Sequence, residues 1–461
     1  MKKELVVLST TAILGYGFPM SSFEEGMKYN PDVIAADAGS TDPGPYYLGA
    51  GYSFTDRSAV KRDLSIMIQA GVKHHIPVII GTCGGSGAMS HLLEVVEIVK
   101  EISKENNLKF KTAIIEAEIN KDTVTKYNNE GKVKPLYPAP VLTQSEIDSS
   151  VRVVAQMGVE PYIKALSNGA EVILAGRSYD PALFSALPVW KGYDMGLATH
   201  MGKILECACI ACTPGSGSDC MIGFLGEDYF RVMPLSTKRK ATTLSVAAHT
   251  LYEKTNPYVL PGPGGYLDLR ETKFEQYSDN CVKVSGSKFV KSEKYTIKLE
   301  GVKCTGYRTV SIAGARDPIF IRKIDEILEG VRERVTDNFK SANYEYQLEF
   351  KIYGINGVMG ALEPVKNPHP HELGIVIDCV APTQEIANTI CGFTRSTMLH
   401  YGYSERKATA GNLAFPYSPS DFKVGAVYEF SMYHVMEVED PCSEFPQKMV
   451  IIDNGEVKEA K

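Results

Sequence analysis

The sequence predicts an α/β protein whose N-terminal half forms a doubly wound, mostly parallel sheet, followed by α+β segments with antiparallel strands. Up to about residue 225, short apolar runs that end in Gly-, Ser- or Asp-rich loops alternate with segments of helical periodicity. Repeated strand–helix units of this kind indicate a parallel sheet with helices on its faces. Beyond that point, alternating runs such as 281–284 and 295–299 are typical of antiparallel strands with one solvated face.

The first half divides into strands and helices by its apolar spacing. A Ser-Ser-Phe-Glu-Glu segment at 21–25 has the hydroxyl and acidic residues of a helix start. Over residues 57–74, apolar residues at Val60, Leu64, Ile68 and Val72 follow the period of a helix that faces a core. The expected strands are 5–8, 33–36, 77–80, 112–115 and 171–175. Four expected helices begin near 21, 57, 88 and 122. A further helix ends near 169, another follows residue 181, and another covers 196–212.

The second half gives further strands at 347–353 and 374–379 and helices over 318–340 and 383–399. A chain of 461 residues exceeds a single ordinary core, so several domains are expected. The predicted division is a Rossmann-like α/β domain over 1–225 that carries the site, an α+β middle region over 226–345, a C-terminal α/β region over 346–440, and a solvated tail over 441–461.

Composition excludes several classes of protein. Net charge is −6, and the sequence has no long basic run, so nucleic acid is not an expected partner. The longest apolar stretches are too short to span a membrane, and Glu4 interrupts the only run that resembles a signal peptide. Ten cysteines without a secretory signal are typical of reduced thiols. We therefore expect a cytoplasmic protein, and a homo-oligomer is the ordinary state of large enzymes of that kind.

The loop after the second expected strand is the most specialised stretch of the chain. Residues 37–51 hold the carboxylates Asp37 and Asp42, the hydroxyls of Ser40 and Thr41, and the Tyr46 ring. Glycines among them allow the backbone to approach a small molecule closely. Loops between a strand and a helix usually run about two to six residues, so this one is unusually long. The alternative is an aspartate that caps a helix and prolines that stiffen a loop.

If the sheet is parallel, the loops after its strands meet at one edge, where open α/β folds bind ligands. That edge would gather Asp37 and Asp42, the glycine-rich loop 81–87, Glu116 with Glu118, and Arg177 with Asp180. Carboxylates beside an arginine suit a site that anchors an anion and moves a proton. The candidate catalytic residues are Asp37, Asp42, Glu118 and Asp180, and the candidate substrate-binding residues are Ser40, Thr41, Tyr46, Gly84, Gly85, Ser86, Gly87, Arg177, Ser178 and Asn412. For each carboxylate, capping of the next helix is the alternative.

The loop Gly81-Thr82-Cys83-Gly84-Gly85-Ser86-Gly87 precedes a helix, whose N–H groups attract phosphate or carboxylate. It lacks the lysine of a P-loop and the spacing of the dinucleotide fingerprint, so NAD is not an expected cofactor. Cys83 is either a nucleophile near a helix N-terminus or a small buried residue. The many carboxylates leave a divalent cation such as Mg²⁺ or Mn²⁺ open as a cofactor.

Cys207, Cys209, Cys212 and Cys220 form the densest cysteine cluster. In a helical segment, positions 207 and 209 point to different faces, which is poor geometry for one metal ion. The histidines at 74, 75, 369 and 371 have no ligand-like neighbours in the sequence. Arg395 and the loop that carries Asn412 could reach the site from the C-terminal region.

Seven stretches together resemble the acyclic terpene utilization (AtuA-like) family of bacterial catabolic proteins. They are ILGYGFP (13–19), DAGSTDPGPYYLG (37–49), AGRSYDPALF (175–184), PGSGSDC (214–220), VAAHTLYEKTNPYVLPGPGG (246–265), GARDP (314–318) and ATAGNLAFPYSPSD (408–421). The resemblance runs over roughly residues 5–436 and implies a role in the breakdown of branched acids and acyl-CoA thioesters. The cysteines at 207, 209 and 212 depart from the family pattern.

Three functions follow as hypotheses. The first is a lyase (hydratase or dehydratase) or isomerase that acts on a small carboxylic acid or its acyl-CoA ester. The second is a non-catalytic ligand-binding component, or a subunit of a catabolic complex that needs a small partner subunit. The third, a dinucleotide oxidoreductase, conflicts with the missing fingerprint.

Overall fold

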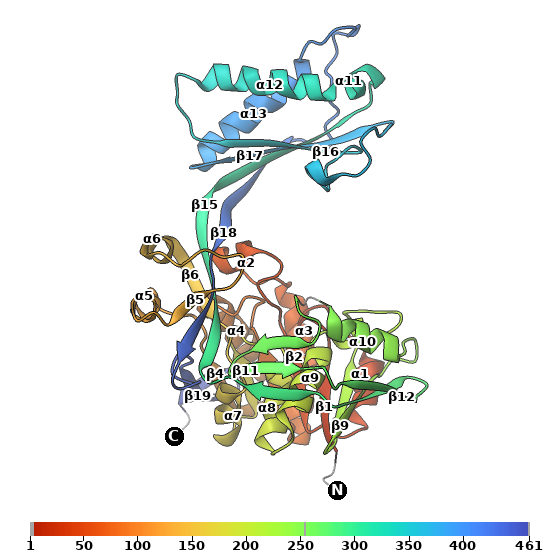
Figure 1. Ribbon diagram of the computed structural model, residues 1–461, viewed down its shortest axis with the longest axis vertical. Helices are drawn as coiled ribbons and strands as arrows, with labels where there is room; N and C mark the ends of the chain where they lie inside the picture. The colour runs from red at the N-terminus through yellow and green to blue at the C-terminus, as the bar shows by residue number, and fades with distance from the viewer. Residues whose placement is uncertain (1–3, 253–254, 460–461) are drawn as a thin grey trace. The chain divides into compact units, whose positions relative to one another are not determined.

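The computed structural model describes residues 4–252 and 255–459, which form two compact units (Figure 1). Unit 1 contains the described residues of 1–303 and 430–461, and unit 2 contains residues 304–429. The chain passes from one unit to the other within the long strands β15 (Tyr295–Ala315) and β18 (Asp421–Val438). No helix in the described ranges combines the length and the apolar character needed to cross a bilayer.

Unit 1 is built on an eleven-stranded sheet with a parallel centre, which confirms the predicted α/β class. The parallel strands lie in the order β1-β2-β3-β7-β4, and antiparallel strands extend the sheet on both sides as β12-β13-β9-β8 and β19-β20. The parallel strands are β1 (Leu5–Ser9), β2 (Val33–Asp37), β3 (Val78–Gly81), β7 (Val172–Ala175) and β4 (Lys109–Ile115). The flanking strands are β8 (Met221–Leu225), β9 (Tyr229–Pro234), β13 (Cys281–Ser285), β12 (Lys273–Ser278), β19 (Gln447–Asp453) and β20 (Glu456–Glu459).

Helices cover both faces of the parallel strands, as a doubly wound sheet requires. Successive residues of each strand point to opposite faces, so Val33 and Ala35 join one buried core while Ile34 and Ala36 join the other. The first core contains α7 (Glu160–Ser167), α8 (Ala182–Trp190) and α9 (Met195–Leu205), and the second contains α1 (Met20–Met27), α3 (Arg57–His74) and α4 (Met89–Glu105). Both faces are apolar, which is why the strands read as continuous hydrophobic runs.

Smaller elements complete unit 1. The strand β6 (Ser150–Ala155) pairs with the first part of β15, and β5 (Val133–Pro135) pairs with the last part of β18. A three-stranded sheet runs in the order β10-β11-β14. The remaining elements are α2 (Pro45–Ala50), α5 (Lys121–Asn129), α6 (Gln144–Ser149), η1 (Ala208–Ala211), α10 (Thr243–Leu251), β10 (Val259–Gly262), β11 (Gly265–Asp268) and β14 (Lys288–Lys291).

Unit 2 packs helices on an antiparallel sheet. The second part of β15 pairs with β17 (Leu373–Ala381), which pairs with β16 (Gln347–Tyr353). In Figure 1, α12 (Ile324–Phe339) and α13 (Gln384–His400) lie together on one side of these strands. The unit also contains α11 (Pro318–Arg322) and η2 (Gly360–Leu362).

The structure differs from the predicted elements in two places that matter below. The helix expected over 196–212 ends at Leu205, because Ala208 takes a left-handed conformation (φ 45°) that interrupts a right-handed α-helix. In the segment expected as a tail, β19 pairs with β4. Its residues Val450 and Ile452 are buried in the core, an alternation typical of a strand with one buried face.

Candidate functional site

Arg177 is the centre of a buried ion-pair network where the parallel strands end. It lies two residues after the end of β7, and its Nε donates to Glu300 Oε2 over 2.7 Å. Its Nη1 donates to Asp180 Oδ1 over 2.8 Å and to the Ser178 carbonyl over 2.8 Å. Arg177 and Glu300 are each 2% exposed, whereas Asp180 is 30% exposed. A buried guanidinium is therefore balanced by two carboxylates, only one of which reaches solvent.

Glu300 links this network to the loop after β2. It lies on β15, and its Oε1 accepts hydrogen bonds from Lys298 Nζ over 2.9 Å and from Thr41 Oγ1 over 3.1 Å. Burial alone would raise the pKa of Glu300, but the positive charges of Arg177 and Lys298 outweigh burial and hold it at about 2. Glu300 is consequently an anion at neutral pH.

Asp37 has the opposite character. It ends β2 and is 5% exposed, and its Oδ1 has no hydrogen-bond partner within the described ranges. Burial and the nearby carboxylates of Asp180 and Glu206 raise the pKa of Asp37 well above its usual range, and the charge of Arg177 opposes them only in part. The carboxyl edge of the sheet thus holds Asp37, which tends to keep its proton, and Glu300, which is ionised.

The glycine-rich loop 81–87 packs tightly beneath these groups. An added Cβ at Gly87 would lie 2.1 Å from the Arg177 nitrogen, and the Arg177 N–H donates to the Gly87 carbonyl over 3.1 Å. The N-terminus of α4 already holds a carboxylate, because the Met89 N–H donates to Glu118 Oε2 over 2.8 Å. Glu118 therefore caps a helix that precedes it in the chain. In the same loop, burial raises the pKa of the Cys83 thiol, which disfavours the thiolate that a nucleophile needs.

The structure places the other predicted residues as follows. Ser178 bonds the buried Tyr162 hydroxyl over 2.6 Å, Ser40 accepts from the Asp42 N–H over 3.1 Å, and the Tyr46 ring meets the Tyr47 ring edge-on at 5.5 Å. Gly84, Gly85 and Ser86 are buried within their loop. Asn412 lies in unit 2, where its amide donates to the carbonyls of Met398 and Tyr401 at the end of α13.

A cavity of about 600 Å³ opens beside Thr41 and Asp42. Lys298 lies in its wall, with its Nζ 4.3 Å from the centre of the Tyr433 ring. Aromatic, proline and methionine side chains make up much of the remaining wall, which consists of Tyr137, Pro138, Ala139, Pro140, Phe430, Ser431, Met432 and Tyr433. The cavity has the size of small-molecule sites and combines an apolar lining with one cation.

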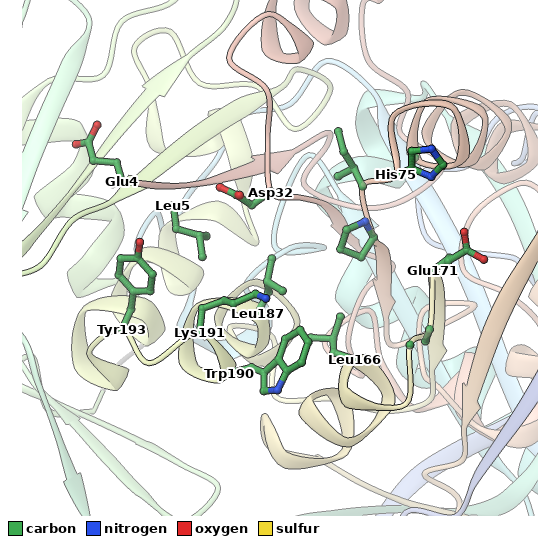
Figure 2. Close-up of a pocket in the computed structure, with 15 residues that line it drawn as sticks. Glu4, Leu5, Asp32, His75, Leu166, Glu171, Leu187, Trp190, Lys191 and Tyr193 are labelled. Carbon is green, nitrogen blue, oxygen red and sulfur yellow. The ribbon is translucent and has the colours of Figure 1, made fainter. Parts of the chain in front are cut away.

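A second cavity, of about 640 Å³, lies at the opposite edge of the sheet (Figure 2). Glu4, Asp32 and Glu171 in its wall directly precede β1, β2 and β7. It is therefore at the amino ends of the parallel strands, away from the network around Arg177.

Another group of polar side chains reaches the carboxyl edge from α9. The Ser9 hydroxyl at the end of β1 donates to the Leu205 carbonyl over 2.6 Å, so the end of α9 lies at this edge. Lys203 pairs with Glu206, and both are at least nine-tenths buried. Cys207 Sγ lies 3.6 Å from the Tyr252 hydroxyl, whereas Cys209 Sγ donates to the Cys220 carbonyl over 3.1 Å. The Cys207 side chain is thus directed to a different set of groups than Cys209.

Sequence reasoning missed Glu300, Lys298, Lys203, Glu206 and His249. Lys298 and Glu300 stand two residues apart on the same face of β15. The alternating run 295–299 contained Lys298 but ended one residue before Glu300. The position of this strand beside the Arg177 loop depends on pairing between β15 and β6, far away in the sequence. His249 lies within the stretch 246–265 that carries the family resemblance.

Comparison with known proteins gives one family. A family model described as "Acyclic terpene utilisation family protein AtuA" matches residues 51–219 and 233–414. The matched ranges include Arg177, Asp180, Glu206, His249 and Glu300, while Asp37 precedes them. Comparisons with curated proteins and with solved structures gave no match.

Proposed function

Since this chain belongs to the acyclic terpene utilisation (AtuA) family, which implies a role in acyclic terpene catabolism, we propose that it is an enzyme that moves a proton on an acyclic terpenoid acid or on its acyl-CoA ester. The reaction class would be a lyase (hydratase or dehydratase) or an isomerase. The observation that carries this proposal is Asp37, a buried carboxyl group whose Oδ1 has no hydrogen-bond partner in the described ranges, beside the Arg177–Asp180 pair.

Asp37 is the proposed acid–base group. A catalytic acid or base works best when its pKa lies near the working pH, and a buried carboxyl group whose pKa is raised moves toward that range. Removal of a proton from the carbon next to a carbonyl, or delivery of a proton to a leaving hydroxyl, needs such a group. The uncommitted Oδ1 is the atom that would exchange this proton.

Arg177 would position the site rather than bind the substrate. Its Nε and Nη1 already donate to Glu300, Asp180 and the Ser178 carbonyl, and the side chain is only 2% exposed, so little of the guanidinium is accessible to a substrate anion. In this role Arg177 holds the Asp180 carboxylate near Asp37. The substrate anion therefore needs another cation as its anchor.

Lys298 is the proposed anchor. Its ammonium group lies in the wall of the 600 Å³ cavity and is partly exposed, so it can meet a carboxylate or a phosphate of coenzyme A. The apolar and aromatic wall suits a branched hydrocarbon chain. Thr41 connects the two parts, because it lines the cavity and its hydroxyl donates to Glu300.

The test is hydrogen exchange in heavy water. The purified chain is incubated in D₂O with acyclic terpenoid acids and, separately, with their CoA esters, and deuterium at carbon is followed by mass spectrometry. We expect incorporation next to the carbonyl with at least one of these compounds, and a fall of about 10²–10⁴-fold in Asp37→Asn, the range typical of acid–base groups. Asp228→Asn is the matched control, because this exposed aspartate lies in the turn between β8 and β9.

Two results would overturn the proposal. One is equal exchange by the wild type and Asp37→Asn under conditions in which both proteins are folded. The other is exchange that requires a second protein, which would identify the chain as a partner-dependent subunit.

A further inference from the structure

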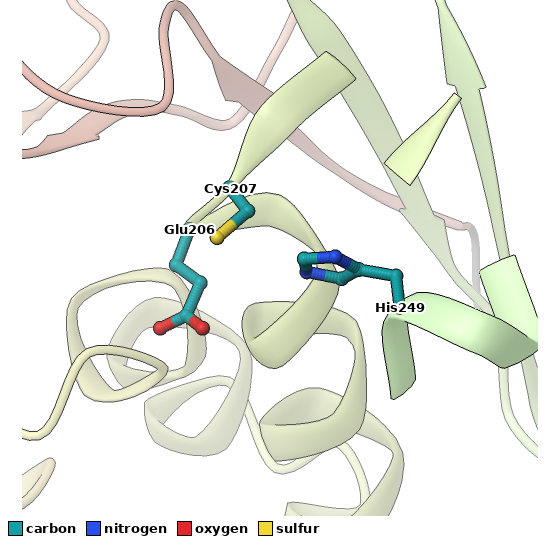
Figure 3. Close-up of side chains that lie close together, drawn as sticks. All are labelled: Glu206, Cys207 and His249. Carbon is teal, nitrogen blue, oxygen red and sulfur yellow. The ribbon is translucent and has the colours of Figure 1, made fainter. Parts of the chain in front are cut away.

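Three different metal-ligand types meet at the end of α9. Glu206 directly follows this helix, Cys207 precedes η1, and His249 lies in the last turn of α10. Figure 3 shows the His249 ring directed toward the Cys207 sulfur from a separate helix. One ligand atom from each residue lies within 4.8 Å of the other two. We propose that Glu206, Cys207 and His249 bind one divalent cation of the zinc class.

The donor set selects the class of metal. A thiolate and an imidazole are ligands of Zn²⁺ and Co²⁺, whereas Mg²⁺ and Mn²⁺ prefer sites made of oxygen alone. Three protein ligands with a fourth position open to water or substrate are typical of catalytic rather than structural zinc. The cluster therefore differs in kind from the carboxylate site for Mg²⁺ or Mn²⁺ that the sequence left open.

The present geometry requires only a small adjustment. Zinc bonds of about 2.0–2.3 Å in a tetrahedron place the ligand atoms roughly 3.3–3.8 Å apart. The observed limit of 4.8 Å exceeds this by about 1 Å, a distance that side-chain rotations can close without moving a helix. Glu206 and His249 are 5% and 7% exposed, so water competes little for their ligand atoms.

The neighbouring charges suit a cation. Cys207 lies within reach of the negative charges of Asp180 and Glu206, and Lys203 is the neighbouring cation. A carboxylate has two oxygens, so the Lys203–Glu206 ion pair is compatible with one bond from Glu206 to a metal. The Tyr252 hydroxyl, 3.6 Å from Cys207 Sγ, is placed to donate to a thiolate from outside the ligand set.

The ion would stand at the same edge of the sheet as Asp37 and Asp180. An open coordination position there can polarise a carbonyl or carboxylate oxygen. The metal site nevertheless stands independently of the proposed reaction, since metal binding is measured without any substrate.

The experiment uses the full chain. Bound metal is first removed with a chelator, and the protein is then dialysed against a small molar excess of Zn²⁺ or of Co²⁺. We expect about one Zn²⁺ per chain by elemental analysis, and for Co²⁺ a thiolate-to-metal charge-transfer band in the near ultraviolet. Cys207→Ser should abolish that band. His249→Gln should weaken metal binding by more than the roughly 10–100-fold that changes outside the ligand set cause.

Cys304→Ser is the matched control, because this exposed cysteine lies in unit 2 and should leave stoichiometry and spectrum unchanged. Cys207→Ser is nearly isosteric at a half-exposed position, so a thermal unfolding curve similar to the wild type is expected for it. The proposal is overturned if the wild type retains no Zn²⁺ or Co²⁺, or if Cys207→Ser and His249→Gln retain the wild-type stoichiometry and the same cobalt spectrum.

Discussion

Replacement of Glu300 by glutamine tests the buried network directly, because it removes one negative charge and keeps the shape of the side chain. In the native protein Glu300 neutralises Arg177 and Lys298, and both Glu300 and Arg177 are 2% exposed. The drop in the pKa of Glu300 from its ordinary 4.5 to about 2 corresponds to about 3 kcal/mol of stabilisation at neutral pH. Loss of one partner of a buried pair typically costs about 3–5 kcal/mol, in agreement. We expect Glu300→Gln to lower the free energy of unfolding by about 3 kcal/mol at pH 7.

The pH dependence has a defined sign. The folded-state pKa of Glu300 is depressed, so its stabilisation is present above the unfolded value near 4.5 and is lost as the pH falls through about 2. The difference between wild type and Glu300→Gln should therefore shrink on acidification, to less than half of its neutral value at pH 3.

The chain provides its own probe for this measurement. Trp190 is the single tryptophan, and it lies at the end of α8 in unit 1, the unit that contains Glu300. Urea unfolding followed by Trp190 fluorescence at pH 7 and pH 3 gives both quantities. The exposed Glu271→Gln serves as control and should stay within about 0.5 kcal/mol of the wild type. A Glu300→Gln value equally close to the wild type at pH 7 would refute the reasoning.

Three further predictions are checked by urea unfolding or, for Lys298, by the deuterium-exchange assay. Asp37→Asn should unfold at an equal or higher urea concentration than the wild type at pH 7, because a carboxyl group whose folded pKa is raised loses stability as the pH rises through that pKa; a clear destabilisation would contradict this. Lys298→Met should raise KM for the exchanging substrate by about ten- to a hundredfold, which corresponds to the free energy of one hydrogen bond to a charged group. An unchanged KM would show that Lys298 does not anchor the substrate. Gly87→Ala (φ +69°) should destabilise unit 1 by well over 1 kcal/mol, because the new Cβ would meet the Arg177 backbone at 2.1 Å. Gly131→Ala, with the same sign of φ (+71°) and open space around it, should cost far less, and equal effects would contradict the steric argument.

The fold was predictable where local pattern and burial agree. Strand β16 and helix α3 begin and end at the residues that the apolar spacing indicates, because each has an apolar period fixed by its own sequence. The end of α9 was not predictable, since the left-handed residue that stops it is an alanine rather than a glycine. Strand β19 was missed because its seven residues mix charged and apolar side chains, and its partner β4 precedes it by more than three hundred residues.

Part of the candidate site at the carboxyl edge of the sheet was predictable from parallel topology alone. Asp37, Arg177 and Asp180 meet there because parallel topology places the ends of β2 and β7 at one edge. Glu300 was not predictable in this way, because it comes from an antiparallel strand 123 positions after Arg177. His249 was not predictable either, because its helix α10 packs against η1 although β8 and β9 separate the two in the sequence.

The two unusual carboxyl groups are coupled through Arg177. The charge of Arg177 is what opposes the retention of a proton by Asp37, while Asp180 and Glu206 favour it. Glu300 neutralises that guanidinium at 2.7 Å and thereby limits its effect on Asp37. In Glu300→Gln the guanidinium would keep Asp180 as its only carboxylate partner among the described residues, and more of its field would reach Asp37. The pKa of Asp37 should then fall, and the pH profile of deuterium exchange should move to lower pH, whereas Glu271→Gln should leave it in place. A profile that is lowered in height without moving would mean that Glu300 supports only the fold.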